Sequence, residues 1–131
     1  MRAIARRIDG RLEQEIEVRQ HRLSSDEPEE RGGEDAGASP QELLAASLAS
    51  CSAITVEMYA ARKGWDVGEM AVVVDYEPAQ RGSPTKFTLR VRMPKELPED
   101  QRERLMQIVA KCPVHRTLEG EVLFDEQVEL A

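Results

Sequence analysis

The sequence has few aromatic residues, only two cysteines, and no long apolar run at its start. Aromatic side chains make up 4% of the chain, and the cysteines are Cys51 and Cys112. Two cysteines are too few for a disulfide-stapled secreted scaffold, and residues 1–10 contain no apolar stretch of the kind found in signal peptides. We therefore expect a cytoplasmic protein whose thiols begin reduced, so that any disulfide is transient or catalytic.

Positive charge is outnumbered by negative charge. The chain has 18 Lys and Arg against 25 Asp and Glu, for a formal net charge of −7. Binding of phosphate backbones requires a concentrated basic surface, so we expect no nucleic-acid partner, and a DNA-binding redox sensor is disfavoured. The most apolar stretch, residues 43–61, is built from Ala and Ser with few large side chains, and we expect no membrane span.

The first third of the chain has the pattern of antiparallel strands followed by a loop. A chain of 131 residues is expected to form a single domain, residues 1–131. Strands are predicted at residues 3–8, 12–18 and 21–25, with Asp9-Gly10 as a two-residue hairpin turn. Residues 26–39 are acidic and contain glycine, which indicates a solvated connection.

A long helix is predicted to follow this loop. Ser39 is the expected N-cap, Pro40 the first helical residue, and Glu42 completes a capping box. Over residues 43–61, Glu57 is the only Asp, Glu, Lys or Arg, so the helix should be covered nearly all round. A helix of about 24 residues is about 36 Å long, too long for one small chain to cover. We therefore predict a homodimer with a large interface.

The remainder of the chain completes a mixed α/β pattern. We expect strands at residues 70–77 and 86–93, an amphipathic helix at 98–111, a helical turn at 112–118 and a closing strand at 122–130. Leu105, Ile108 and Val109 should face the core from the amphipathic helix. Val122, Phe124 and Val128 should be buried in the closing strand, and no segment repeats another. The predicted fold class is α/β with a long central helix.

The two cysteines occupy opposite local settings. Cys51 lies in the middle of the apolar helix, where a free cysteine is commonly inert packing and becomes reactive only beside a cation such as arginine. Cys112 directly precedes Pro113 at a predicted helix start, where backbone N–H groups stabilise a thiolate. Local physics therefore makes Cys112 the more acidic thiol, although a simple capping role would suit it equally well.

His115 follows Cys112 by three positions and raises the question of a metal. His21, Cys51, Cys112 and His115 offer suitable ligand atoms for zinc, but they form only one short C-x-x-H spacing. Structural zinc sites normally use two ligand pairs. We expect no metal and no cofactor, and we expect His115 to cap or hydrogen-bond near the second thiol.

Taken together, the cysteine contexts resemble a known family. Residues 39–46 (SPQELLAA), with Cys51 eleven positions after Pro40, look like its central-helix signature, and residues 111–115 (KCPVH) look like its second-cysteine motif. Residues 26–33 and 62–65 are also similar to family members. The family is that of the osmotically inducible protein C and the organic hydroperoxide resistance proteins (OsmC/Ohr), and the resemblance extends over essentially the whole chain.

The resemblance implies both a fold and a reaction. The fold is α/β, with two chains intertwined around their central helices. In the implied peroxidase cycle, the Cys51 thiolate attacks an organic hydroperoxide, and Cys112 resolves the resulting sulfenic acid as a disulfide. A small dithiol or a lipoyl-type reductant then restores the thiols.

The sequence differs from the family pattern at one position that is important for activity. Peroxidase members pair an arginine with a carboxylate directly after the helix-starting proline, where this chain has Gln41. Glu42 is the available substitute, although it also serves as a capping residue, and Arg11 is the nearest counterpart of the arginine, although it also fits an ordinary exposed strand position. A non-catalytic dimer that binds a small hydrophobic or thiol ligand is therefore the alternative to a peroxidase.

Overall fold

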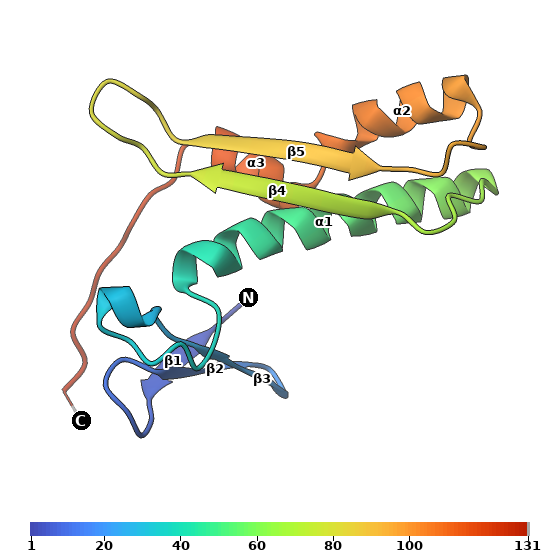
Figure 1. Ribbon diagram of the computed structural model, residues 1–131. Coiled ribbons are helices and arrows are strands. Elements are labelled where there is room, and N and C mark those ends of the chain that lie inside the picture. The colour runs from blue at the N-terminus through green and yellow to red at the C-terminus, as the bar shows by residue number, and fades with distance from the viewer. Residues whose placement is uncertain (131) are drawn as a thin grey trace. The chain divides into compact units, whose positions relative to one another are not determined.

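The computed structural model describes residues 1–130, which form two compact units (Figure 1). The first unit is Met1–Ala46 and the second begins at Ser47. The elements in chain order are β1 (Ile4–Arg7), β2 (Gln14–Val18), β3 (His21–Ser25), η1 (Glu29–Arg31), α1 (Pro40–Lys63), β4 (Ala71–Glu77), β5 (Lys86–Arg92), α2 (Glu99–Val109) and α3 (Pro113–Glu119). This order confirms the predicted α/β class, whereas the single domain stays a prediction.

The first unit is built on a three-stranded antiparallel sheet in the order β1-β2-β3. Residue 7 pairs with residue 14, so β1 and β2 are joined by residues 8–13. The predicted two-residue turn at Asp9-Gly10 is therefore wrong. The longer loop is held from outside the hairpin, because the backbone N–H of Arg11 donates to the Glu34 carboxylate at 3.0 Å. Short-range turn rules do not include such a contact.

The acidic loop after β3 is organised by Asp26, which is only 3% exposed. Its carboxylate accepts hydrogen bonds from the backbone N–H groups of Glu27 at 2.8 Å, Glu34 at 3.1 Å and Ala36 at 3.1 Å. Burial alone would raise the pKa of Asp26, but these N–H donors and the nearby charge of Arg11 lower it. The loop is thus folded around one ionised carboxylate.

Asp26→Asn should lower the thermal unfolding midpoint at neutral pH by several degrees, because an amide oxygen is a weaker acceptor and its NH₂ group opposes the loop N–H donors. The folded pKa of Asp26 lies below the unfolded value of about 3.9. Its contribution is therefore present above that value and is lost as pH falls through the folded pKa. Thermal melts from pH 7 to pH 3 should show the difference from wild type shrinking with acid. Asp35→Asn in the same loop is the matched control, and an equal effect of both changes would contradict this account.

The start of α1 follows the predicted capping box. Ser39 Oγ accepts from the Glu42 N–H at 3.1 Å, and the Glu42 carboxylate accepts from the Ser39 N–H at 2.9 Å. These two bonds satisfy donors that would otherwise have no partner at the helix end. The hydrogen bonds from Ser39 lower the pKa of Glu42, so the cap contains a carboxylate that is ionised at neutral pH.

In the second unit, α1, α2 and the β4–β5 hairpin pack together and form the hydrophobic core (Figure 1). Leu105, Ile108 and Val109 are buried, as the amphipathic pattern of α2 predicts. They pack with Val56 and Ala60 of α1. Partly buried side chains of β5 cover this cluster. The hydrophobic faces of three elements thus fix the position of α1 within the unit.

The described chain covers only one stripe of α1. Leu48, Ser52, Val56 and Ala60 are buried, and their spacing of four residues marks a single helix face. Ile54 and Met58, by contrast, are 55% and 60% exposed. The expectation of a helix covered nearly all round is thus met on one side only. By length and hydropathy, α1 also resembles a membrane span, a property that core helices of soluble proteins share.

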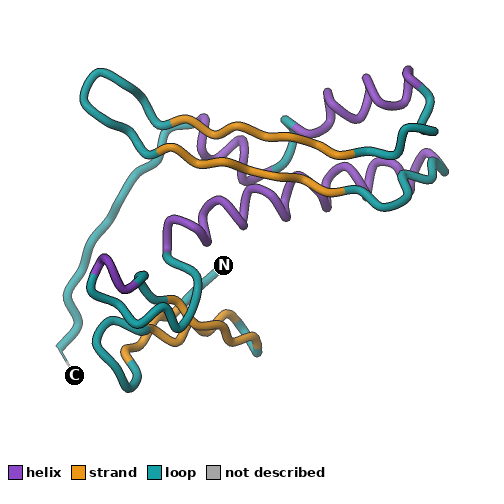
Figure 2. Tube along the Cα trace, in the orientation of Figure 1, coloured by secondary structure: helices purple, strands orange, loops and turns teal. Residues whose placement is uncertain are grey.

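The C-terminal residues 121–130 contain no regular secondary structure (Figure 2). The predicted closing strand is therefore wrong for the single chain, and so is the burial of its side chains. Val122, Phe124 and Val128 are 50%, 83% and 85% exposed. The physical reason is that a strand requires a neighbour for its backbone groups, and within residues 1–130 this segment pairs with none.

Candidate active site around Cys51 and Cys112

Cys112 caps the short helix α3, as predicted from its position before Pro113. Its backbone is extended and its Sγ accepts a hydrogen bond from the His115 N–H at 3.2 Å. The Cys112 side chain is 0% exposed. The prediction that His115 hydrogen-bonds near this thiol is confirmed, although the donor is its backbone N–H.

Cys51 approaches the same helix end from the middle of α1. Its thiol lies close enough to the Cys112 thiol and to the Val114 backbone N–H for both groups to shift its pKa. Cys51 is half-buried, and Ser52 beside it is fully buried. Packing of α1 against α3 therefore brings together two sulfurs that are 61 positions apart in the sequence.

The surroundings of the two thiols shift their acidities in opposite directions. Burial raises the pKa of the Cys51 thiol, and the neighbouring Cys112 thiol raises it further, against the opposing effects of Val114 and Thr55. Burial alone would also raise the pKa of Cys112. However, the neighbouring Cys51 thiol, the backbone N–H groups at the start of α3 and the Ser52 hydroxyl together lower the pKa of Cys112. Cys112 is thus the more acidic thiol, in agreement with its local sequence.

The two thiols also differ in access. Cys51 lines a groove of about 450 Å³ along α1, whereas Cys112 is fully buried and does not line it. The groove is lined by Ser47, Ser50, Cys51, Ile54, Thr55, Met58, Arg62, Pro113 and Val114. An external molecule can therefore reach the Cys51 sulfur along a mostly apolar surface.

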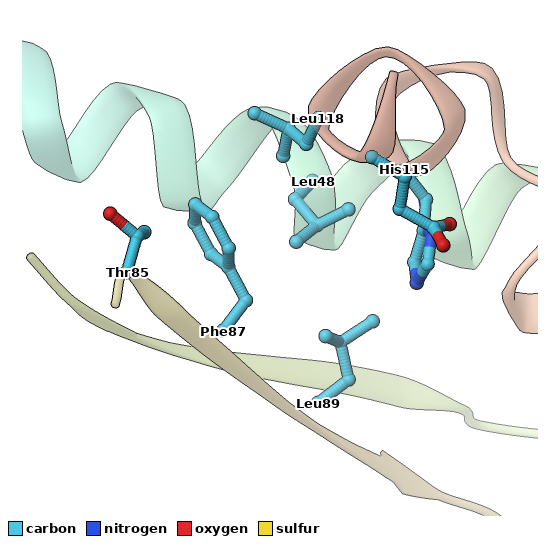
Figure 3. A pocket seen from close by; sticks show the side chains of 7 residues that line it. Leu48, Thr85, Phe87, Leu89, His115 and Leu118 are labelled. Atoms are coloured by element: carbon cyan, nitrogen blue, oxygen red, sulfur yellow. The ribbon is translucent and has the colours of Figure 1, made fainter. Parts of the chain in front are cut away.

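A second, smaller hollow of about 280 Å³ lies between α1, α3 and the β5 side of the hairpin (Figure 3). Its lining residues are Leu48, Thr85, Phe87, Leu89, His115, Leu118 and Glu119. The His115 Nδ1 lies beside the Glu119 carboxylate, one turn further along α3. No sequence motif indicates either the hollow or the groove, because each is formed by side chains from separate elements.

Arg11 and Glu42, the other two predicted site residues, lie in the first unit. The Arg11 guanidinium donates to the Gly33 carbonyl at 3.3 Å, and Glu42 forms the capping box. These contacts give both residues structural partners within that unit. Their roles toward Cys51 remain predictions.

The fold and the site together define a class: an α/β protein with one thiol on a long central helix and a second thiol capping a short helix. Residues 32–127 match the family model described as OsmC-like protein. The match spans more than half of the chain, and this protein therefore belongs to the OsmC-like family. No curated protein is similar enough in sequence to match it.

Solved structures of the OsmC/Ohr fold resemble the chain over most of its length. An organic hydroperoxide resistance protein OsmC from Legionella pneumophila is 20% identical, with a TM-score of 0.65, covering 90% of this chain and 88% of that one. OhrB, an organic hydroperoxide resistance protein of Bacillus subtilis, is 20% identical with a TM-score of 0.61 and coverages of 91% and 90%. A Psychrobacter arcticus protein of osmotic stress and detoxification response is 22% identical with a TM-score of 0.73 and coverages of 88% and 85%. At these identities the similarity shows the fold.

Proposed function

We propose that this protein is a thiol-dependent peroxidase that reduces organic hydroperoxides in oxidative-stress defence, with Cys51 as the peroxidatic and Cys112 as the resolving cysteine. The observation that supports this most is the paired arrangement of the thiols. Cys51 lines an apolar groove, and Cys112 is buried close enough to shift the pKa of Cys51. Membership in a family with members called hydroperoxide resistance proteins favours the same chemistry.

The proposed cycle has three balanced steps. The Cys51 thiolate attacks the terminal oxygen of R–O–OH; the O–O bond breaks, Cys51 becomes a sulfenic acid, and the departing alkoxide takes a proton to leave as ROH. The Cys112 thiol then attacks the sulfenic sulfur, forming the disulfide and releasing water. An external dithiol, of a small or lipoyl type, reduces this disulfide and is itself oxidised to a disulfide.

The first step requires an ionised Cys51, which the surroundings within residues 47–130 oppose. A guanidinium is the natural counter-charge for a thiolate in an apolar site. We propose Arg11 for this role, with Glu42 orienting it in place of the carboxylate that Gln41 cannot supply. The alternative, a non-catalytic binding protein, is favoured by the raised pKa of Cys51 and by the apolar hollow of Figure 3.

We further propose that the protein works as an intertwined homodimer in the cytoplasm. The exposed C-terminal segment contains Val122, Leu123, Phe124, Val128 and Leu130. Monomeric proteins rarely leave so many large apolar side chains uncovered in one stretch. A second copy of the chain would cover this segment.

The first test is a change in mass. Reduced protein treated with one equivalent of cumene hydroperoxide should lose two hydrogens, and peptide mapping should then join residues 51 and 112. Addition of a dithiol should restore the original mass. Unchanged mass, together with saturable binding of an apolar probe such as 2-phenyl-2-propanol, would instead favour the non-catalytic alternative.

A further inference from the structure

Ser52 is a polar residue on the buried stripe of α1, one turn from Leu48 and one turn from Val56. Its side chain is 0% exposed. Within residues 1–130 its hydroxyl forms no hydrogen bond. Serine hydroxyls inside helices commonly bond a backbone carbonyl of the preceding turn, as Ser50 does with Ser47 at 3.2 Å. A buried hydroxyl without such a partner costs free energy, so its presence in the core calls for an explanation.

The Cys112 thiol is the polar group that the Ser52 hydroxyl is near enough to affect. Burial opposes the ionisation of Cys112, whereas the Cys51 thiol, the His115 N–H and the Ser52 hydroxyl lower its pKa. The His115 N–H already donates to the sulfur at 3.2 Å. A serine hydroxyl rotates about its C–O bond and can turn its proton toward an acceptor. The Ser52 proton is therefore free for a sulfur that becomes negative.

A thiolate at Cys112 needs such donors because its sulfur is fully buried. A buried anion is stable only when donors or cations replace the water that it has lost. From α3, backbone N–H groups face the sulfur, and the His115 ring lies beside the Glu119 carboxylate. From α1, the titratable Cys51 thiol and the neutral Ser52 hydroxyl face it. Ser52 thus adds a side-chain donor to those of the helix end.

We propose that Ser52 is a positioning residue whose hydroxyl donates to the Cys112 sulfur whenever that sulfur is negative, both as resolving nucleophile and as leaving group. This inference rests on the proposed peroxidase function and adds a residue to it. In resolution, the Cys112 thiolate attacks the Cys51 sulfenic sulfur, the S–O bond breaks, and the departing hydroxide takes a proton to form water.

The same donor acts in the opposite direction when the disulfide is reduced. A thiolate of the external dithiol attacks the accessible Cys51 sulfur, the S–S bond breaks, and its electron pair remains on Cys112. The second sulfur of the dithiol then closes its own disulfide and frees Cys51. A thiol of lower pKa leaves faster, so the Ser52 hydroxyl favours attack at Cys51 and release of Cys112.

The ionisation test compares Ser52→Thr with Ser52→Val, which have nearly the same shape and differ in the hydroxyl. Cysteine labelled at Cβ with a heavy carbon isotope gives one NMR signal per thiol, which shifts on ionisation, and Cys51→Ser assigns the two signals. The pKa of Cys112 should be higher in Ser52→Val than in Ser52→Thr, because valine offers the thiolate no donor. Ser52→Ala against wild type repeats the comparison without added volume. Equal values within both pairs would overturn the proposal, whether or not hydroperoxides are reduced.

The kinetic test follows disulfide formation after one equivalent of cumene hydroperoxide. Loss of one donor should reduce the Cys112 thiolate fraction about tenfold at neutral pH, and the greater nucleophilicity of a less acidic thiol offsets about half of this on a logarithmic scale. Ser52→Ala should therefore form the disulfide about threefold more slowly at neutral pH, and the difference should shrink toward pH 9.

The pH dependence separates this role from packing. A slowing that is the same at every pH would indicate lost packing alone and would overturn the proposal. The disulfide can also be formed with diamide, without peroxide, and its reduction by a dithiol should then be slower in Ser52→Val than in Ser52→Thr. Failure of wild type to reduce any hydroperoxide, with this difference intact, would contradict only the proposed reaction.

Discussion

Cys51→Ser should abolish the dithiol-driven reduction of cumene hydroperoxide, lowering kcat/KM by at least about a thousandfold, because serine supplies no comparable nucleophile. Cys112→Ser should instead permit one oxidation per chain and then stall at the Cys51 sulfenic acid, which dimedone traps. Steady-state peroxide consumption and the mass of the dimedone adduct measure the two results. Far-ultraviolet circular dichroism shows whether each variant is folded.

The pH dependence of that single oxidation provides a sharper check. The Cys112 thiol raises the pKa of Cys51, and serine at position 112 cannot carry the competing negative charge. The pKa of Cys51 should therefore fall in Cys112→Ser, so that the rate of single-turnover oxidation reaches half its maximum at a lower pH than in wild type. Rapid-mixing measurements between pH 5 and pH 9 would detect this change.

If Cys112 were the attacking thiol instead, the two serine variants would give the reverse results. Cys112 is the more acidic thiol, and if acidity outweighed access it would be the attacking group. Cys51→Ser would then retain a single oxidation, with dimedone attached at residue 112, while Cys112→Ser would react with no peroxide. That outcome would exchange the two proposed roles and preserve the disulfide cycle.

The parts of the fold that the sequence predicts well are those determined by nearby residues. The capping box of Ser39 and Glu42, the inward face of α2 and the N-cap role of Cys112 all depend on residues within one or two helical turns. Local propensity and side-chain spacing are sufficient for such features. The meeting of Cys51 with Cys112 is different, because local patterns provide no measure of contact across 61 positions, and only the resemblance to a family indicated it.

The predictions that failed concern segments whose structure depends on contacts with residues far away in the sequence. Asp9-Gly10 has the composition of a tight turn, yet a bond from Arg11 to Glu34 supports a longer loop. The sequence does not predict the groove for a related reason: the groove requires α1 and α3 to pack, which brings Pro113 and Val114 beside Cys51.

The C-terminal segment alternates in the way that a strand does. Val122, Phe124, Val128 and Leu130 fall on one face of an extended chain, with Glu126 as the exception, while Asp125, Gln127 and Glu129 fall on the other, with Leu123 as the exception. In the single chain its apolar side chains remain exposed. An extended segment with one apolar face is stable only when a neighbouring sheet or chain accepts it. This explains why the pattern predicts a strand that one chain does not form.

The double change Phe124→Glu and Val128→Glu should therefore convert the proposed dimer to a monomer. Each large apolar side chain buried at an interface contributes about 1.5–3 kcal/mol, and two such residues from each of two chains would be replaced by charges. The dissociation constant should rise by more than about a hundredfold. Light scattering after gel filtration at micromolar concentration measures the mass directly. Gln127→Glu adds a charge to the opposite face of the same segment and should leave the mass unchanged. Equal masses for the double variant and wild type would exclude this segment from the dimer contact, whereas dissociation by Gln127→Glu alone would show that charge, rather than the apolar face, controls the association.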